Sequence, residues 1–186
     1  MGYRKAFKFM KISEILKKYD TDKDKRNHMY GRAYDAVLEK FDRNAKLDIA
    51  EIGVLYGESI RAWRECFPNA NITGVDIVDL VENKLEDVEY VISDVRRYIP
   101  DKRFDIVIDD GSHKINDVMF TIKHFQLKPG GVMVIEDCNR PYTLFEKIKK
   151  KTKNSIECID LRELGQSRHI DDFLIVLRNY GYYETL

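Results

Sequence analysis

The sequence is poor in several features that would assign it to a particular class of protein. Its 186 residues include 3 cysteines and 4 prolines, and the cysteines lack the paired spacing of zinc or dithiol sites. Basic and acidic side chains number 32 each, so no net charge favours nucleic acid or an anionic membrane. No apolar run approaches the length of a membrane span, and none follows the basic N-terminus as in a signal peptide. We expect a protein of the reducing cytoplasm that has neither a nucleic-acid nor a membrane partner.

The hydrophobic content of 44% is sufficient for one well-formed core in a chain of this length. Residues 1–46 contain two amphipathic helical patterns, from Ile12 to Tyr19 and from Tyr30 to Phe41. We interpret them as a short helical cap over the carboxyl edge of a sheet that residues 47–186 form. The whole chain is expected to make one compact domain.

Beyond residue 46, short β-branched runs alternate with longer amphipathic stretches, which is typical of a parallel sheet covered by helices on both faces. The predicted strands are 47–53, 71–76, 88–93, 104–109, 131–135, 155–160 and 172–177. The predicted helices are 59–66, 115–125 and 142–151, and all four prolines are expected at element boundaries. No helical pattern separates the last two strands, so we expect the final strand to be antiparallel in an otherwise parallel sheet.

Acidic side chains follow two of the predicted strands. Asp109 and Asp110 end one strand shortly before His113, and Glu136 and Asp137 end another. Because open α/β sheets bind ligands at the carboxyl ends of their strands, these groups are expected to converge. Hard oxygen donors suit magnesium, calcium or manganese better than zinc, and the histidine is a candidate proton acceptor. The competing interpretation is that the acids cap the next turn and that the histidine is an ordinary surface residue.

A glycine turn between the first strand and the next helix is a second candidate ligand site. It contains Glu51, Gly53, Gly57 and Ser59, and its glycines would let a ligand approach the backbone near a helix N-terminus. Leu55 stands where a full Gly-x-Gly-x-x-Gly fingerprint has its middle glycine, so pyrophosphate binding loses support. An ordinary structural turn would have the same pattern.

Two further aspartates favour a nucleotide-like ligand. Asp76 ends the second strand, 23 residues after Gly53, where an acidic side chain can accept hydrogen bonds from both hydroxyls of a ribose. Asp94 follows the third strand and is placed to face an adenine amino group. Each aspartate taken singly is more often a turn or cap residue, but their placement at successive strand ends favours binding.

Together these motifs resemble those of the class I S-adenosylmethionine-dependent methyltransferases. The chain resembles most the metal-dependent sugar O-methyltransferases of macrolide biosynthesis, over roughly residues 20–177. The resemblance is carried by the motifs EIGV at 51–54, GES at 57–59, Trp63, FP at 67–68, DDGSH at 109–113, KPGG at 128–131 and ED at 136–137, with TDK at 21–23 and HMY at 28–30 upstream.

The resemblance implies a Rossmann-like fold, S-adenosylmethionine as the methyl donor and a divalent ion, usually Mg²⁺. It implies that Asp110, Glu136 and Asp137 hold the ion and that His113 is the general base. The residues that it assigns to the cofactor are Glu51, Gly53, Gly57, Ser59, Asp76, Asp94 and Asp109. The implied acceptor is a hydroxyl of a sugar or a sugar-containing small molecule, and assembly into a homo-oligomer stays open.

Two other functions also stay open at this point. An NAD-type oxidoreductase would use the same Gly53, Gly57 and Asp76, although Leu55 and the antiparallel last strand count against it. A non-catalytic binding module with a methyltransferase fold is the other alternative. A pure scaffold has no need of a partly buried cluster of like charges, which favours an enzyme.

Overall fold

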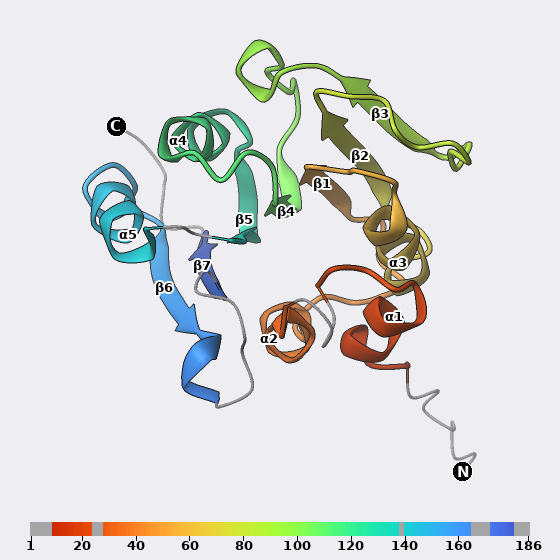
Figure 1. Ribbon diagram of the computed structural model, residues 1–186, viewed down its shortest axis with the longest axis horizontal. Coiled ribbons are helices and arrows are strands. Elements are labelled where there is room, and N and C mark those ends of the chain that lie inside the picture. Colours follow the sequence, from red (N-terminus) through yellow and green to blue (C-terminus); the bar gives the residue numbers. More distant parts are fainter. Residues whose placement is uncertain (1–8, 24–27, 138–139, 165–171, 181–186) are drawn as a thin grey trace.

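The computed structural model describes residues 9–23, 28–137, 140–164 and 172–180. Its centre is one seven-stranded sheet in the order β3-β2-β1-β4-β5-β7-β6 (Figure 1). The strands are β1 (Asp48–Ile52), β2 (Asn71–Asp76), β3 (Val88–Ile92), β4 (Phe104–Asp109), β5 (Leu127–Ile135), β6 (Ser155–Asp160) and β7 (Phe173–Arg178). Strands β1 to β5 pair in parallel, whereas β7 pairs antiparallel with both β5 and β6. The prediction of a mostly parallel sheet with an antiparallel last strand is confirmed.

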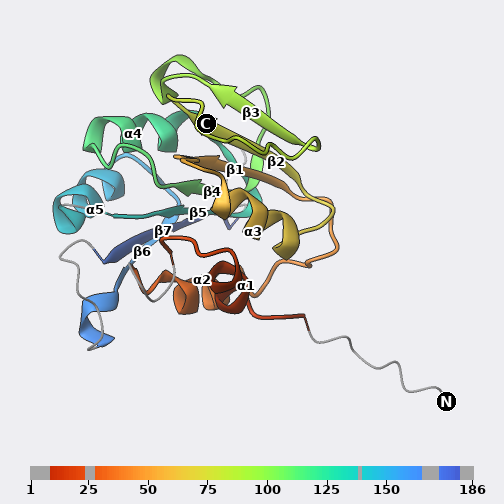
Figure 2. The same ribbon diagram turned by 45° about the vertical axis from the view of Figure 1, so that its right-hand side comes forward.

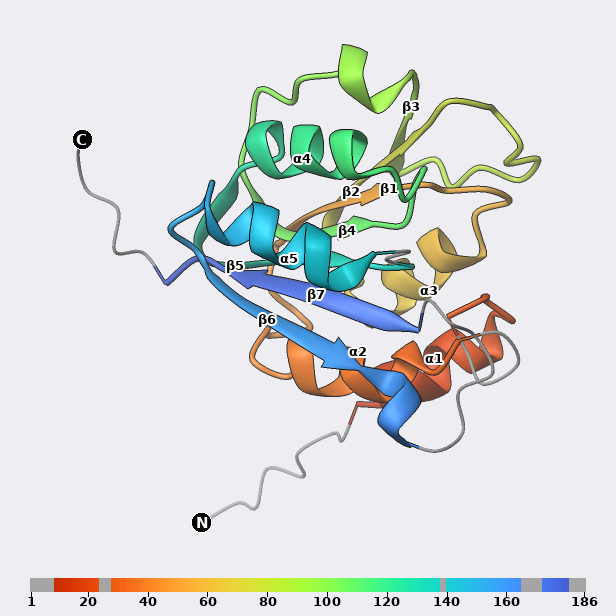
Figure 3. The same cartoon turned by 60° about the vertical axis from the view of Figure 1, so that its left-hand side comes forward.

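Helices cover both faces of the sheet (Figures 2 and 3). The helices on one face are α1 (Ile12–Lys18), α2 (Tyr30–Leu38) and α3 (Glu58–Cys66), and those on the other are α4 (Ile115–His124) and α5 (Pro141–Lys149). Ile106 and Ile108 of β4 pack in the core beside α1 to α3, whereas Val107 between them packs beside α4 and α5. Both faces of the central strands are therefore apolar. None of the helices in the described ranges is long and apolar enough to cross a membrane.

The two N-terminal helices pack against a face of the sheet rather than over its carboxyl edge. Leu16 of α1 and Leu38 of α2 are buried in the same core as α3 and the sheet. Burial of a whole apolar stripe on a sheet face removes more apolar surface from water than contact with an edge. The prediction that these helices cover the edge is wrong for the helices themselves, but Lys23, His28 and the tyrosines of α2 contact acids at that edge.

Strand β5 begins at Leu127, four residues before its predicted start, so Pro129 lies within a strand instead of at a boundary. The pairing of β5 with β4 shifts register between Phe104 and Ile106. Such an irregularity accommodates proline, which has no N–H to donate to the ladder. Two short 3-10 turns complete the fold, η1 (Val95–Arg97) and η2 (Leu161–Leu164). Helix α2 ends at Leu38, three residues before the end of its predicted pattern, and the other elements end within one or two residues of their predicted limits.

Candidate functional site

A pocket of about 500 Å³ opens at the carboxyl ends of β1, β2 and β4. Residues that follow these strands and β3 line it, among them Gly53, Asp76, Asp94, Asp110 and His113. The strand order reverses between β1 and β4, which is where open α/β sheets usually bind their ligands. Side chains predicted from separate motifs therefore do meet at one pocket.

The turn after β1 accepts only glycine at its first position. Gly53 has a φ of +85°, and a Cβ atom there would lie 2.1 Å from the carbonyl oxygen of Asp110. The carboxylate of Asp76 closes the turn, because its Oδ2 accepts hydrogen bonds from the N–H groups of Val54 at 2.8 Å and Leu55 at 2.9 Å. Asp76 thus orders the glycine turn as well as lining the pocket.

Asp94 caps η1 and forms an ion pair at the rim of the pocket. Its Oδ1 accepts a hydrogen bond from the backbone N–H of Arg96 at 2.9 Å, and its Oδ2 lies 3.0 Å from Nη2 of the same arginine. These bonds lower the pKa of Asp94 below its ordinary value. Arg96 also lies 3.3 Å from Asp117 of α4, so the guanidinium connects the two sides of the rim.

The acids behind the pocket share one buried cation, the ammonium group of Lys23, whose side chain is 2% exposed. Its Nζ donates a hydrogen bond to Asp110 and lies 3.1 Å from Glu136 and 3.7 Å from Glu51. Burial alone would lower the pKa of Lys23, but these carboxylates outweigh burial and hold the pKa well above its ordinary value. Burial raises the pKa of Glu51 to about 7 although Lys23 opposes the shift. Lys23 therefore neutralises a cluster that would otherwise be strongly repulsive.

Two tyrosines of α2 hold the acids at the end of β5. The hydroxyl of Tyr30 donates to Asp137, and the hydroxyl of Tyr34 donates to Glu136. Burial and the adjacent carboxylates raise the pKa of both tyrosines, so both stay protonated and act as donors. Helix α2 therefore orients the acidic pair through two tyrosine hydroxyls.

His28 joins the same network. Its Nδ1 lies 2.6 Å from Oδ1 of the buried Asp172 and 3.4 Å from Oδ1 of Asp137. Its ring stacks on that of Tyr30 with centroids 4.9 Å apart. The start of α2 and the start of β7 are thereby connected to Asp137.

Strained backbone and an unpaired nitrogen mark the pocket side of the cluster. Among the described residues, four non-glycine residues have positive φ, and Leu55, His113 and Asp137 of these line the pocket. Nδ1 of His113 is buried and has no hydrogen-bond partner in the part of the chain that the structure covers. One ligand atom from each of Asp110, His113 and Asp137 lies within 4.8 Å of the others. This grouping has the dimensions and donors of a divalent cation site.

Four residues that the resemblance assigns to the cofactor lie beneath the pocket instead of on its wall. Glu51 is fully buried and accepts a hydrogen bond from Ser59 Oγ at 2.8 Å. Gly57 is the N-cap of α3. Asp109 is also buried, and this burial raises the pKa of its carboxyl group to about 6. Ser59 lines a smaller cavity of about 220 Å³, which borders the main pocket at Gly53.

A further cavity of about 440 Å³ adjoins the main pocket on the side of α4. The two cavities share Arg96, His113, Lys114 and Asp117, and Arg140 lines the outer side of the second one. His113 therefore lies between two spaces, each large enough for part of a small molecule.

The motifs TDK at 21–23 and HMY at 28–30 are part of the resemblance, but they predict no contact for their residues. The structure places Lys23, Tyr30 and His28 in contact with the predicted acids. A signal for this role was present in the polar run TDK at 21–23 and in HMY at 28–30, between two amphipathic helices. Nothing in the local pattern said which strand ends these residues would meet.

Known proteins with similar sequences are macrolide O-methyltransferases. Mycinamicin VI 2''-O-methyltransferase of Micromonospora griseorubida is 34% identical over a region covering 68% of this chain and 35% of that protein. Demethylmacrocin O-methyltransferase of Streptomyces fradiae is 33% identical, covering 68% of this chain and 36% of that protein. The chain has the fold and motifs of a class I S-adenosylmethionine-dependent methyltransferase. It resembles the macrolide sugar type within this class, and no protein-family model matches it.

A solved structure supports the same assignment. The MycE methyltransferase of the mycinamycin biosynthetic pathway, in complex with Mg and SAH, matches with a TM-score of 0.60 and 32% identity. The match covers 70% of this chain and 37% of that one. The methyltransferase-like region thus spans little more than a third of the length of these relatives.

Proposed function

We propose that the chain transfers the methyl group of S-adenosylmethionine to a hydroxyl of a sugar or sugar-containing small molecule, with the help of Mg²⁺. The observation that carries the proposal is the position of His113 between the main pocket and the adjoining cavity, beside the acidic cluster. A methyl transfer needs a donor site and an acceptor site that meet at a proton acceptor. The names of the relatives add support for an O-methyl product.

The main pocket suits the nucleoside part of the cofactor. We assign the ribose to Asp76 and the adenine side to Asp94, because both line the pocket beside the glycine turn. The smaller cavity at Gly53 and Ser59 suits the amino-acid end of the cofactor. Glu51, Gly57 and Asp109 act from below, where they order the turn and the ends of β1 and β4.

The acidic cluster fits a divalent cation. One ligand atom each from Asp110 and Asp137 lies within 4.8 Å of the other, and Glu136 adjoins Asp110 across the ammonium of Lys23, which Mg²⁺ would displace from these acids. We assign Asp110, Glu136 and Asp137 as the residues that hold Mg²⁺. When bound by these residues, Mg²⁺ would lower the pKa of a coordinated hydroxyl and orient it for attack.

His113 is the group that takes the proton. The bond that forms joins the acceptor oxygen to the methyl carbon, the bond that breaks joins this carbon to the sulfonium sulfur, and the hydroxyl proton passes to the imidazole. His113 lines both the main pocket and the adjoining cavity, which favours it as the proton acceptor for a hydroxyl bound there. Tyr30 and Tyr34 keep the acids oriented while the acceptor binds.

The experiment is a methyl-transfer assay with S-adenosylmethionine, Mg²⁺ and a panel of free sugars, nucleotide sugars and glycosides. The product is an O-methylated sugar that forms together with S-adenosylhomocysteine. A His113→Gln variant should lose turnover while still binding S-adenosylhomocysteine, and His124→Gln, at the far end of α4, is the matched control. Equal turnover in the His113 and His124 variants would refute the assigned base.

A further inference from the structure

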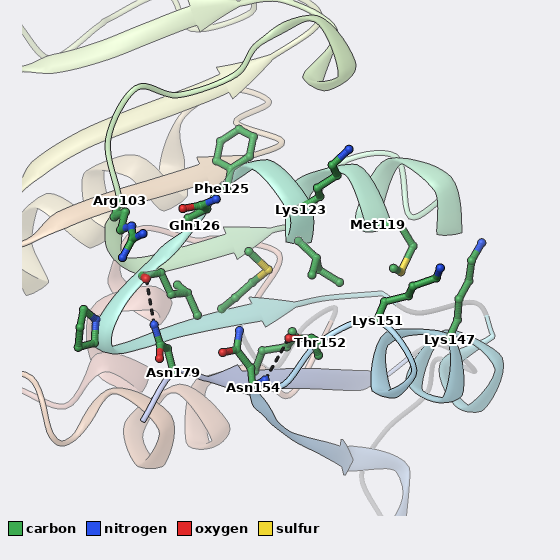
Figure 4. A pocket seen from close by; sticks show the side chains of 15 residues that line it. Arg103, Met119, Lys123, Phe125, Gln126, Lys147, Lys151, Thr152, Asn154 and Asn179 are labelled. Atoms are coloured by element: carbon green, nitrogen blue, oxygen red, sulfur yellow. Dashed lines mark hydrogen bonds between the residues drawn. The ribbon is translucent and has the colours of Figure 1, made fainter. Parts of the chain in front are cut away.

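A second kind of site lies at the opposite end of the strands. A cavity of about 720 Å³ is bounded by α4, by α5 with the turn after it, and by the beginnings of β4 and β5 (Figure 4). Arg103 lies just before β4, and Asn179 lies just after the antiparallel β7. None of its lining residues lines the main pocket, so a ligand here would leave the methyl-transfer site accessible.

The floor of this cavity is apolar. Phe125, Leu127, Met133 and Leu177 form its buried part, and Met119 on α4 is only partly buried. The volume falls within the range of about 300 to 1,000 Å³ that small-molecule sites usually have. A soluble protein that leaves such a concave apolar surface open has a surface suited to a partner molecule.

The rim of the cavity is basic. Arg103, Lys123, Lys147 and Lys151 contribute four positive charges, and no aspartate or glutamate is among the described residues that line it. Of these four side chains, only Lys147 has a hydrogen-bond partner within the described part of the chain, Asn116 Oδ1 at 3.5 Å. Unpaired cations around an apolar floor favour a ligand that is both negatively charged and apolar.

We propose that this cavity binds an amphipathic organic anion, meaning a small molecule with an apolar body and a carboxylate or phosphate group. The apolar body lies on Met119, Met133 and Leu177, and the anionic group lies among the lysines. The proposal is independent of the methyl-transfer function, because the two sites have no residue in common.

The test is a calorimetric titration of monomeric decyl phosphate into the full chain, with inorganic phosphate and decyl glucoside as separate probes. The expected result is saturable one-to-one binding of decyl phosphate. Inorganic phosphate, which has no apolar chain, and decyl glucoside, which has no negative charge, should each bind much more weakly. The double variant K123Q/K151Q should weaken binding by about 2- to 30-fold, the effect of removing two exposed charge contacts. Raising the salt concentration should weaken binding to the wild-type chain and have less effect on the variant.

The matched control is K149Q/K150Q, which removes the same number of exposed lysines at the end of α5, next to Lys151, and neither of them lines the cavity. A cooperative thermal unfolding transition like that of the wild type in every variant checks that the fold is intact. Equal affinity of decyl phosphate for K123Q/K151Q and the control variant would overturn the proposal. If the chain bound anionic vesicles but did not bind monomeric decyl phosphate, the proposal would also be overturned, and the surface would be a membrane contact.

Discussion

Replacement of Lys23 by methionine tests how the acidic cluster is held together. Methionine keeps most of the volume of the buried stem and removes the charge that Asp110, Glu136 and Glu51 share. Glu51 and Glu136 are 0% and 1% exposed, so water cannot take over the role of the ammonium group. Removal of one partner from a buried ion pair typically costs about 3–5 kcal/mol, and here three acids lose the same partner.

We therefore expect Lys23→Met to lose about 3–5 kcal/mol of unfolding free energy at neutral pH in the presence of a chelator. The assay is urea unfolding of wild-type and variant chains, with Lys18→Met as the control, because Lys18 pairs with Glu65 at the surface and should leave stability nearly unchanged.

Added Mg²⁺ gives the second half of this test. A cation that binds the folded chain should restore more stability to Lys23→Met than to the wild type, because the variant has an uncompensated negative cluster. If Lys23→Met had the same unfolding free energy as the wild type in the presence of a chelator, the expectation would be refuted. That result would mean that the acids do not depend on the lysine for charge neutralisation.

Three further predictions concern the site. Asp110→Asn should weaken Mg²⁺ binding at least tenfold in calorimetry, since loss of a charged ligand costs about 1.5–3 kcal/mol. His113→Ala should leave Mg²⁺ affinity nearly unchanged. The reverse pattern would make the histidine a ligand instead of the base. Asp76→Ala should reduce affinity for S-adenosylhomocysteine by about tenfold or more. Asp79→Ala, on the following loop, is the control and should not reduce it. Equal affinities of the two variant chains would remove the ribose assignment. Burial holds the pKa of Glu51 at about 7 in the folded chain against an ordinary 4.5, so the folded chain takes up a proton before the unfolded one as pH falls. The unfolding free energy under chelation should therefore rise by about 2 kcal/mol between about pH 7.5 and 5.5, and a Glu51→Gln chain that shows the same rise would contradict this source.

The order of strands and helices could be predicted because apolar residues repeat on both faces of the central strands. Val107 packs on one side and Ile106 and Ile108 on the other, so β4 appears in the sequence as a continuous apolar run. The exception is β5, where Pro129 looks like a boundary but lies in a strand whose register shift accommodates it. A bulge depends on the neighbouring strand, and local sequence does not specify it.

The acids of the site could be predicted because they directly follow strands, and parallel strands bring their carboxyl ends together. The partners of these acids could not. Lys23, Tyr34 and Tyr30 come from the N-terminal segment, and the acids that they contact lie 87, 102 and 107 residues away in the chain. Whether a lysine in such a loop is solvated or buried depends on how that segment packs, which periodicity does not reveal.

The most direct test of the account is calorimetric titration of S-adenosylhomocysteine into the full chain, with Mg²⁺ present and after chelation, and with NAD as the control ligand. We expect one-to-one binding of S-adenosylhomocysteine and none of NAD, together with a separate Mg²⁺ isotherm that Asp110→Asn weakens. Saturable binding of NAD, or no binding of S-adenosylhomocysteine by folded protein, would contradict the assignment of the pocket at the carboxyl edge.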